Sequence, residues 1–366
     1  MRLTHKDALR LFDEGDLIEL GKQADAIRKD KFGNVTTFIV DRNINYTNVC
    51  QNECKFCAFF RRANSSGAYL LTHEEILAKV RETVEANGTQ VMIQGGLHPD
   101  LPLEWYEDML RLIKKNFDVT IHSFTATEIQ HFANKAGLSI LETLKRLQAA
   151  GLDSLPGGGA EILVDDVRRR ISPKKISADD WLNVMKLGHS IGMKSTATMV
   201  IGFGESLRQR LEHMQKIRDL QDETGGFRAF ITWTYQPLNT QLGGEKVSSW
   251  DYMKTLAMTR IFLDNVDHIQ GSWVTQGERI GQLTLAFGAD DLGSIMLEEN
   301  VVRAAGTSFD MSTRKMVDLI YTAGRVPAQR NTAYEVLRFF GRRVTAYEKF
   351  SALTANRETA NFLPDN

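Results

Sequence analysis

The stretch Asn43-Ile-Asn-Tyr-Thr-Asn-Val-Cys50-Gln-Asn-Glu-Cys54-Lys-Phe-Cys57 holds all three cysteines of the chain, spaced C-x3-C-x2-C. Thiolates are soft ligands that suit iron–sulfur clusters or zinc. A cubane of four irons on three thiolates keeps one iron without a protein ligand, and that open corner is what catalysis needs and an electron carrier avoids. The spacing therefore predicts a catalytic [4Fe-4S] cluster on Cys50, Cys54 and Cys57.

A structural zinc site is the main alternative for these cysteines. It would need a fourth ligand at close spacing, and no histidine lies between Cys57 and His73. Three unrelated buried thiols are a further alternative, but they would have to gather within eight positions by chance. A secreted disulfide framework is not expected from three clustered cysteines, so the sequence favours a reducing cytoplasm.

Composition narrows the class of partner. The 366 residues are 42% hydrophobic and 25% charged, and the formal net charge is −1. Nothing in this balance indicates nucleic acid or an anionic membrane as a partner. The first residues lack the apolar stretch of a signal peptide, and no apolar run approaches the roughly 20 residues of a membrane helix. We therefore expect a small-molecule substrate, no nucleic acid and no membrane.

Strands and helices alternate along most of the chain. Such βα units, wound right-handed, predict an α/β fold with a partial or full TIM-type barrel. Strands are expected at 36–40, 91–93, 117–121, 152–155, 195–201, 228–233 and 268–271. The predicted organisation is an N-terminal helical extension (1–36), the barrel (37–296) and a C-terminal helical extension packed on it (297–366), with helices that include 316–320 and 336–340.

Polar and glycine-rich segments follow the predicted strands. Barrels carry their chemistry at the carboxyl ends of the strands. The segments there are Gln94-Gly95-Gly96, His122-Ser123, Gly157-Gly-Gly, Gly202-Phe-Gly-Glu205, Thr234-Tyr-Gln and Ser272-Trp-Val-Thr-Gln. This registration predicts that the cysteine loop and these segments form one site.

Each of these segments also has a structural interpretation. The glycines of Gln94-Gly95-Gly96 let a ligand approach the backbone, or they form an ordinary turn. The carboxylates of Glu128 and Glu161 suit ribose hydroxyls or an amine, or they cap helices. Glu205 contacts a cofactor, or it stabilises a helix N-terminus.

Two charged stretches stand apart from the strand ends. The basic run from Arg168 to Lys175 is expected to be a solvated face. The pairs Asp290-Asp291 and Glu298-Glu299 flank Gly293-Ser-Ile-Met, where they would orient a substrate or accept a proton. Loop and helix-cap chemistry is the alternative for both pairs.

The cysteine loop resembles that of the radical S-adenosylmethionine (SAM) superfamily. The resemblance implies that the amine and carboxylate of SAM bind the open iron, and that an electron from a reductant such as flavodoxin or ferredoxin breaks the sulfonium C–S bond. It further implies that Phe56 lies near the adenine, that Gln94-Gly95-Gly96 binds the methionyl amine, and that Ile201-Gly-Phe-Gly-Glu205 lies beside the adenine. Ser123, Glu128 and Glu161 complete the expected SAM site.

A narrower resemblance covers roughly residues 8–340. The run from Asp41 to Arg61 is similar to a subgroup that contains the menaquinone enzymes of the futalosine route and the deazaflavin (F0) synthases. The segments that resemble the family of cyclic dehypoxanthine futalosine synthases are 94–102, 155–162, 272–277, 288–294 and 298–301. Ser123-Phe-Thr-Ala-Thr-Glu128 departs from that family's pattern, which often has proline before the glutamate.

The resemblance implies a radical cyclisation in menaquinone biosynthesis. The 5′-deoxyadenosyl radical removes the C4′ hydrogen of dehypoxanthine futalosine, the carbon radical adds to the benzoate ring, and loss of an electron and a proton restores aromaticity. The candidate proton acceptors are Asp290, Asp291, His98 and His122. Aminofutalosine synthase and a deazaflavin synthase subunit are alternatives on the same scaffold, and a non-catalytic iron–sulfur or zinc-binding protein is an alternative of another class.

Overall fold

The computed structural model describes residues 2–307 and 309–341. Its strands are β1 (Val35–Ile39), β2 (Asp41–Ile44), β3 (Gln90–Ile93), β4 (Thr120–Ser123), β5 (Ser154–Leu155), β6 (Lys194–Ile201), β7 (Phe227–Thr234), β8 (His268–Gln270), β9 (Asp291–Ser294), β10 (Val326–Arg330) and β11 (Val336–Phe339). Its helices are α1 (His5–Glu14), α2 (Leu17–Phe32), α3 (His73–Glu85), α4 (Leu103–Asn116), α5 (Ala126–Ala136), α6 (Ile140–Ala150), α7 (Asp165–Ile171), α8 (Ala178–Ser190), α9 (Leu207–Thr224), α10 (Ser249–Phe262), α11 (Glu278–Leu283), α12 (Val301–Ala304) and α13 (Thr313–Thr322).

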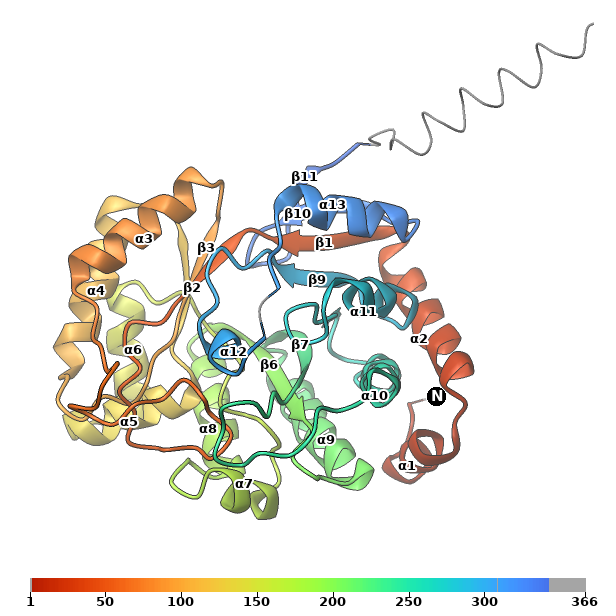
Figure 1. Ribbon diagram of the computed structural model, residues 1–366, viewed down its shortest axis with the longest axis horizontal. Helices are drawn as coiled ribbons and strands as arrows, with labels where there is room; N and C mark the ends of the chain where they lie inside the picture. Colours follow the sequence, from red (N-terminus) through yellow and green to blue (C-terminus); the bar gives the residue numbers. More distant parts are fainter. Residues whose placement is uncertain (1, 308, 342–366) are drawn as a thin grey trace, which may run out of the picture.

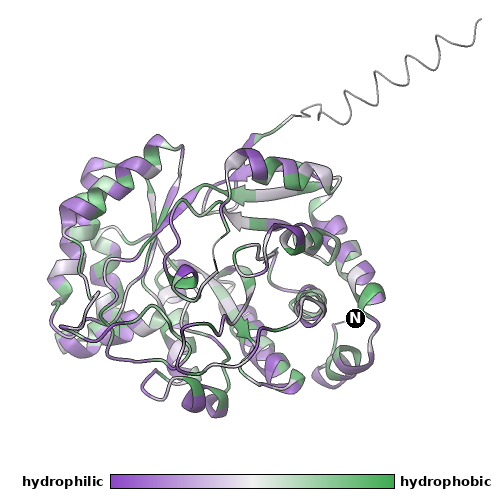
Figure 2. Ribbon diagram, viewed as in Figure 1, coloured by the Kyte–Doolittle hydropathy of each residue, from purple (hydrophilic) through white to green (hydrophobic). Residues whose placement is uncertain are grey.

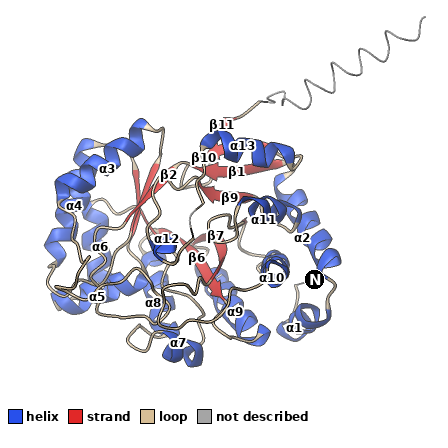
Figure 3. Cartoon of the chain, in the orientation of Figure 1, coloured by secondary structure: helices blue, strands red, loops and turns tan. Residues whose placement is uncertain are grey.

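All of these strands belong to one sheet, in the order β11-β10-β1-β9-β8-β7-β6-β5-β4-β3-β2. The β10–β11 pair is antiparallel, whereas the other pairs are parallel. Only Val40 separates β1 from β2, so residues 35–44 pair with β9 on one side and with β3 on the other. The sheet therefore curls into a partial TIM-type barrel, and β10 and β11 extend it beyond β1 (Figures 1 and 3).

Helices cover the outside of the curled sheet. A capping box starts α3: Thr72 Oγ1 accepts the Glu75 N–H at 3.2 Å, and the Glu75 carboxylate accepts the Thr72 N–H at 2.7 Å. The buried residues of α3 include Ile76 and Val80, on the face toward the core. The outward helix faces are largely hydrophilic (Figure 2), so the core lies between helices and sheet.

The N-terminal helices α1 and α2 occupy the stretch in which an extension is expected. The Asp16 carboxylate accepts the backbone N–H groups of Ile18 and Glu19, which starts α2. Helix α2 packs against α10, and α1 packs against α9 and α10 (Figure 1). The extension therefore lies on the outer helices and away from the strand ends.

The C-terminal region differs from the prediction. Residues 336–339, expected to be helical, form strand β11, and β9 and β10 were also not predicted as strands. A short apolar run such as Val336-Leu-Arg-Phe is compatible with a helix or a strand. It forms a strand here because the edge of β10 offers backbone hydrogen bonds to it. The expected helix at 316–320 lies within α13. The part of the predicted extension from 342 to 366 lies outside the described residues.

Within the described ranges, no helix is both long and apolar enough to cross a membrane. The predicted polar segments lie at the carboxyl ends of β3, β4, β5, β6, β7 and β8, and His122-Ser123 forms the last two residues of β4 itself. The fold thus brings these segments to the end where the cysteine loop follows β2.

Candidate functional site

The cysteine loop is held by backbone hydrogen bonds from several directions. Cys50 N donates to Arg61 O at 3.0 Å, and Gln51 N donates to Leu97 O at 3.2 Å. Lys55 N donates to Ile171 O at 2.9 Å. The loop is therefore attached to itself, to the segment after β3 and to the end of α7, which fixes where its thiols point.

The three thiols line one cavity of about 220 Å³. Cys54 is buried, Cys50 and Cys57 are partly buried, and none of the three forms a disulfide. Burial raises the pKa of Cys54 to about 12, so a thiolate here needs the positive charge of a metal centre. In the described part of the chain, no three Cys, His, Asp or Glu side chains converge to hold a single metal ion. A cubane cluster does not require three side chains to converge on one point, because each thiolate binds a different iron. The three cysteines therefore fit such a cluster.

The glycines of Gln94-Gly95-Gly96 are required by contacts within the protein. A Cβ on Gly96 would lie 2.2 Å from Val49 O, and a Cβ on Gly95 would lie 2.5 Å from the Tyr46 ring. The Gly96 N–H donates to Thr47 O at 2.9 Å. The segment therefore packs directly against the cysteine loop, and all three of its residues line the cysteine cavity.

Glu128 lines the same cavity, but its carboxylate is already engaged. It accepts the Gly95 N–H at 3.0 Å and the Tyr46 hydroxyl at 2.8 Å, and it forms a capping box with Thr125. Burial raises its pKa. Glu128 therefore holds the glycine segment in place. The predicted residue Ser123 is fully buried, and it is not among the residues that line either cavity.

Glu161 has a different environment. Its Oε1 accepts from Lys175 Nζ at 2.5 Å, and its Oε2 is buried with no partner among the described residues. The Lys175 ammonium lies 5.4 Å from the centroid of the Phe56 ring. Glu161, Lys175 and Phe56 all line the cysteine cavity. The predicted residues Glu161 and Phe56 thus lie together beside the thiols.

The basic run is not a uniformly solvated face, which corrects the sequence expectation. Lys175 is only 10% exposed, and Arg168 is buried and donates to the carbonyls of Ala160 and Ile176. Arg169 and Lys174 are exposed, as expected. Sequence reasoning missed Lys175 because alternate members of a short charged run can face opposite directions.

The predicted adenine segment after β6 does not line the cysteine cavity. The Glu205 carboxylate accepts the N–H groups of Gly202 and Phe203 and the Nε–H of Arg210 at 2.8 Å. Neither Ile201 nor Glu205 lines the cysteine cavity. The ring of Phe203 instead lies 5.3 Å from that of Phe56. The structure therefore places Glu205 in the turn before α9, where it stabilises backbone.

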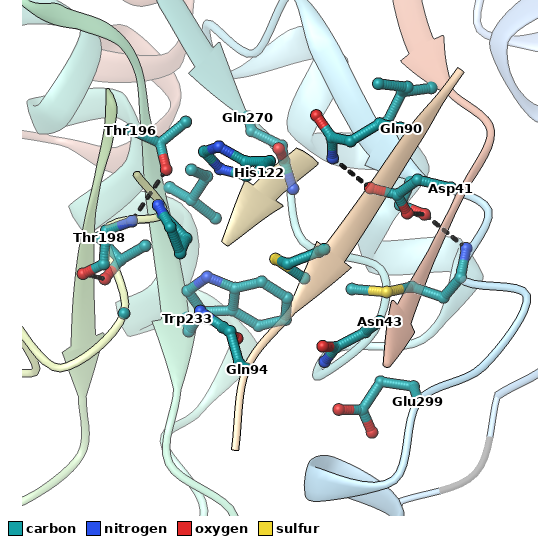
Figure 4. A pocket seen from close by; sticks show the side chains of 18 of the residues that line it. Asp41, Asn43, Gln90, Gln94, His122, Thr196, Thr198, Trp233, Gln270 and Glu299 are labelled. Carbon is teal, nitrogen blue, oxygen red and sulfur yellow. Dashed lines mark hydrogen bonds between the residues drawn. The ribbon is translucent and has the colours of Figure 1, made fainter. Parts of the chain in front are cut away.

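A second cavity of about 290 Å³ occupies the barrel interior. It shares Gln94, Gly158, Gly159, Glu161 and Val301 with the cysteine cavity. Figure 4 shows Asp41 and Gln90 on one side of it, joined by a hydrogen bond, with His122, Trp233 and Gln270 nearby. The shared wall makes the two cavities adjoin, so groups bound in them would meet near Glu161.

Of the four predicted proton acceptors, only His122 lines the barrel cavity. Its Nδ1 lies 2.7 Å from Ser154 Oγ. Burial, together with the charges of Arg228 and Arg330, lowers the pKa of His122 to about 3. The imidazole is therefore neutral, and its surroundings oppose protonation.

Asp290 and Asp291 do not reach the cavity, which corrects their predicted role. The Asp290 carboxylate forms an ion pair with Arg260 and lies 2.6 Å from His268 Nδ1. Asp291 accepts from Arg330 Nε at 2.6 Å and Nη2 at 2.9 Å. Both carboxylates are buried and saturated by protein donors.

His98 lies in the loop after β3, outside both cavities. Its Nδ1 accepts the Asp100 N–H at 3.2 Å, and burial lowers its pKa. The structure therefore gives His98 a role in the turn rather than in the site.

Sequence reasoning missed the residues at the far end of the barrel cavity. Arg228, Thr332 and Tyr334 line it, together with Arg330. These residues come from the start of β7 and from the turn between β10 and β11. Since neither β10 nor β11 was predicted, no sequence signal connected this turn with the barrel interior.

Two family models match the chain. The radical SAM superfamily model matches residues 44–217, and a model described as the CofH/MqnC C-terminal region matches residues 224–342. The first span contains the cysteine loop and Glu161, and the second contains β7 and the turn that closes the barrel cavity. The residues that line the cysteine cavity all fall within these two spans. The barrel cavity also draws Ile39, Asp41 and Asn43 from just before the first span.

Several curated proteins are similar over nearly the whole chain. Cyclic dehypoxanthine futalosine synthase of Halalkalibacterium halodurans is 46% identical over 352 residues, which cover 95% of each chain. The enzyme of that name from Streptomyces coelicolor is 48% identical, over 92% of this chain and 86% of its own. Aminodeoxyfutalosine synthase of Thermus thermophilus is 39% identical, over 93% of this chain and 94% of its own.

Solved structures support the fold alone, because their sequence identity is low. The FeFe-hydrogenase maturase HydG from Carboxydothermus hydrogenoformans has a TM-score of 0.72 at 18% identity, over 91% of this chain and 77% of its own. Methylornithine synthase (PylB) has a TM-score of 0.72 at 20% identity, over 90% of this chain and 95% of its own.

Proposed function

This chain belongs to the radical SAM family, and from that membership we propose that it converts dehypoxanthine futalosine to its cyclic product in menaquinone biosynthesis. The observation that carries the proposal is the wall shared by the cysteine cavity and the barrel cavity. A radical generated beside the thiols can reach a substrate in the barrel only where the two cavities adjoin. Adjoining cavities hold the radical source and the substrate close together, which a radical transfer needs.

The proposed cofactors are a [4Fe-4S] cluster on Cys50, Cys54 and Cys57, and SAM beside it. Bound together, they supply the 5′-deoxyadenosyl radical that abstracts a hydrogen atom. Phe56 and Gln94 line the cavity in which SAM would lie. We propose a one-electron reductant such as flavodoxin or ferredoxin as partner, and the reducing cytoplasm as the compartment that keeps the three thiols available.

The pair Glu161–Lys175 is the polar group that orients the cofactor in this proposal. Lys175 holds one carboxylate oxygen of Glu161 at 2.5 Å, and the other oxygen has no described partner. That oxygen would accept a hydrogen bond from a ribose hydroxyl or from the methionyl amine. Glu128 acts indirectly, because it holds Gly95 and through it the strand end under the cysteine loop.

The barrel cavity holds the substrate in this proposal. Its walls combine apolar side chains such as Ile231 and Met92 with amides such as Gln270. Such a cavity excludes water and competing hydrogen donors while it holds the two carbons that must bond. We propose His122 as acceptor of the ring proton, because it alone of the predicted acceptors lines the cavity. With a pKa of about 3 it accepts only from the strongly acidic ring cation that forms once the electron has been lost.

A panel of substrates tests the proposal. The reconstituted protein is reduced anaerobically with SAM and given either dehypoxanthine futalosine or the substrates of aminodeoxyfutalosine synthase, and the products are identified by mass. We expect 5′-deoxyadenosine together with a cyclised product two hydrogen atoms lighter than the substrate from dehypoxanthine futalosine alone. Cys54→Ala is the control, and it should form neither product. Turnover of the aminodeoxyfutalosine synthase substrates instead would assign the chain to that relative's reaction.

A further inference from the structure

Arg228 faces the barrel interior because β7 is irregular at this point. In the pairing of β6 with β7, Ser195 is opposite Phe227 and Thr196 is opposite Ala229, so Arg228 is an extra residue on β7. Beyond it, Ile231 and Trp233 line the cavity with the usual period of two, yet Arg228 lines it as well. A β-bulge re-aims a side chain in this way, and bulges occur next to active sites.

The guanidinium of Arg228 has no acidic partner. Its Nη1 donates to the Thr332 carbonyl at 2.7 Å, and within residues 2–307 and 309–341 no carboxylate lies within 4 Å of it. The neighbouring Arg330 is different, because Asp291 binds it with both carboxylate oxygens. Burial lowers the pKa of Arg228, but a guanidinium keeps its charge in proteins. The Asp153 carboxylate raises this pKa from beyond contact distance, so the guanidinium is a cation that no carboxylate contacts.

The surroundings of Arg228 add further donors. Thr332 lines the same cavity, and its hydroxyl is buried with no hydrogen-bond partner among the described residues. The Thr332 carbonyl orients Arg228 from the turn between β10 and β11. The fixed guanidinium and the free hydroxyl form one end of the cavity, and both are suited to an anion with two oxygens.

We propose that Arg228 binds the aryl carboxylate of the substrate at this end of the barrel cavity, with Thr332 as a second donor. The inference rests on the proposed function, in which the substrate carries a benzoate group. Ile231 and Trp233, next along β7, supply apolar surface for the aromatic ring. The other end of the cavity contains Glu161 and adjoins the thiols, so this anchor directs the ribose carbons toward them.

Calorimetry with a fragment tests the anchor independently of turnover. The full-length reconstituted protein is titrated at pH 8 with 3-acetylbenzoate and with its methyl ester, which has the same ring and no charge. We expect wild-type protein to prefer the acid, and we expect Arg228→Met to weaken acid binding about 10- to 100-fold, as for loss of a charge-assisted hydrogen bond. Binding of the ester should not change.

Two further variants complete the test. Arg228→Lys keeps the charge and should recover part of the acid affinity, which a merely structural role of Arg228 would not predict. Arg314→Gln is the matched control, because Arg314 is 79% exposed on α13, and it should bind both probes as wild type does. Equal affinity of wild type for acid and ester, equal acid affinity of wild type and Arg228→Met, or equal loss of both ligands in Arg228→Met would each overturn the proposal.

The anchor and the reaction can fail separately. If Arg228→Met binds the acid normally while the wild-type protein cyclises dehypoxanthine futalosine, the anchor is wrong and the function stands. If the acid requires Arg228 but no cyclised product forms, the anchor stands and the cavity serves another aryl carboxylate. With the true substrate, Arg228→Met should raise KM far more than it changes SAM cleavage measured without substrate.

Discussion

Lys175 Nζ lies 2.5 Å from Glu161 Oε1 in the wall that the two cavities share. Both side chains are at most 10% exposed. Burial alone would lower the pKa of Lys175, but the charges of Glu161 and Cys54 and the hydrogen bond to Glu161 together outweigh it, and the pKa is raised. The ion pair is therefore intact at neutral pH, and it fixes the orientation of the second carboxylate oxygen.

Glu161→Gln should impair SAM binding without loss of the cluster. The amide keeps a hydrogen bond to Lys175 but removes the charge that a cofactor hydroxyl or amine would contact, so we expect KM for SAM to rise about 10- to 100-fold. Glu212→Gln is the matched control, because Glu212 pairs with Lys216 on α9, outside both cavities. An unchanged KM, or loss of bound iron, would contradict this role for Glu161.

Gly96→Ala should disturb the cysteine loop. The new Cβ would meet Val49 O at 2.2 Å, and a backbone atom cannot yield as a flexible side chain can. We expect a lower content of iron per chain after reconstitution and a lower unfolding temperature. In Gly341→Ala, the control, the Cβ would meet no described atom within 4 Å. Wild-type iron content in Gly96→Ala would show that the contact is not limiting.

Asp291→Asn separates a structural carboxylate from a catalytic one. Asp291 and Arg330 form a buried bidentate pair. Removing one charge leaves the other buried without a partner, which lowers the free energy of unfolding by about 3–5 kcal/mol. Denaturant titration should show this loss. Replacing both partners, as Asp291→Leu with Arg330→Met, should recover part of it. A variant of wild-type stability that no longer turns over would restore Asp291 as a proton acceptor.

His213 should contribute to the acid sensitivity of the fold. Burial lowers its pKa from 6.5 to about 3, and its Nδ1 accepts the Leu163 N–H at 2.9 Å. The unfolded chain binds a proton below about pH 6.5 that the folded chain excludes, so stability falls as pH falls through this window, by about 1.4 kcal/mol per pH unit for one such group.

The variant His213→Gln keeps a hydrogen-bond acceptor and cannot titrate. The free energy of unfolding, measured by denaturant titration from about pH 6.5 to about pH 4.5, should therefore depend less steeply on pH than in wild type, by about one proton. Other titrating groups, among them Asp41 and His189, are the same in both proteins and cancel in the difference. Parallel pH profiles would rule out a buried neutral His213.

The sequence was sufficient for the features that local patterns encode. The spacing of Cys50, Cys54 and Cys57 predicted thiols around one centre, and the structure places all three on one cavity. Helix starts and stops, such as the capping box at Thr72 and the C-cap at Gly137, depend on neighbouring residues and are therefore local features of the same kind. Strand ends could be located for the same reason, so Gln94 and Glu161 were found.

The predictions that failed concern residues whose partners are brought together only by the tertiary structure. Asp290 and Asp291 look like free acids in sequence, but their partners Arg260 and Arg330 lie 30 and 39 residues away. In the sequence, Arg228 looks like an ordinary strand residue. The bulge that turns its side chain toward the barrel interior arises only from the pairing of β7 with β6. Strand β10 was missed because its short run Val326-Pro-Ala-Gln-Arg330 has no clear period.

The most direct test of the central claim is transfer of a label from the substrate. Dehypoxanthine futalosine carrying deuterium at C4′ is incubated anaerobically with the reduced, reconstituted protein and SAM, and both products are examined by mass spectrometry. The account predicts that one deuterium appears in 5′-deoxyadenosine and that the cyclised product lacks it. Formation of 5′-deoxyadenosine without deuterium, with the substrate recovered unchanged, would contradict the claim that this chain cyclises dehypoxanthine futalosine by abstraction at C4′.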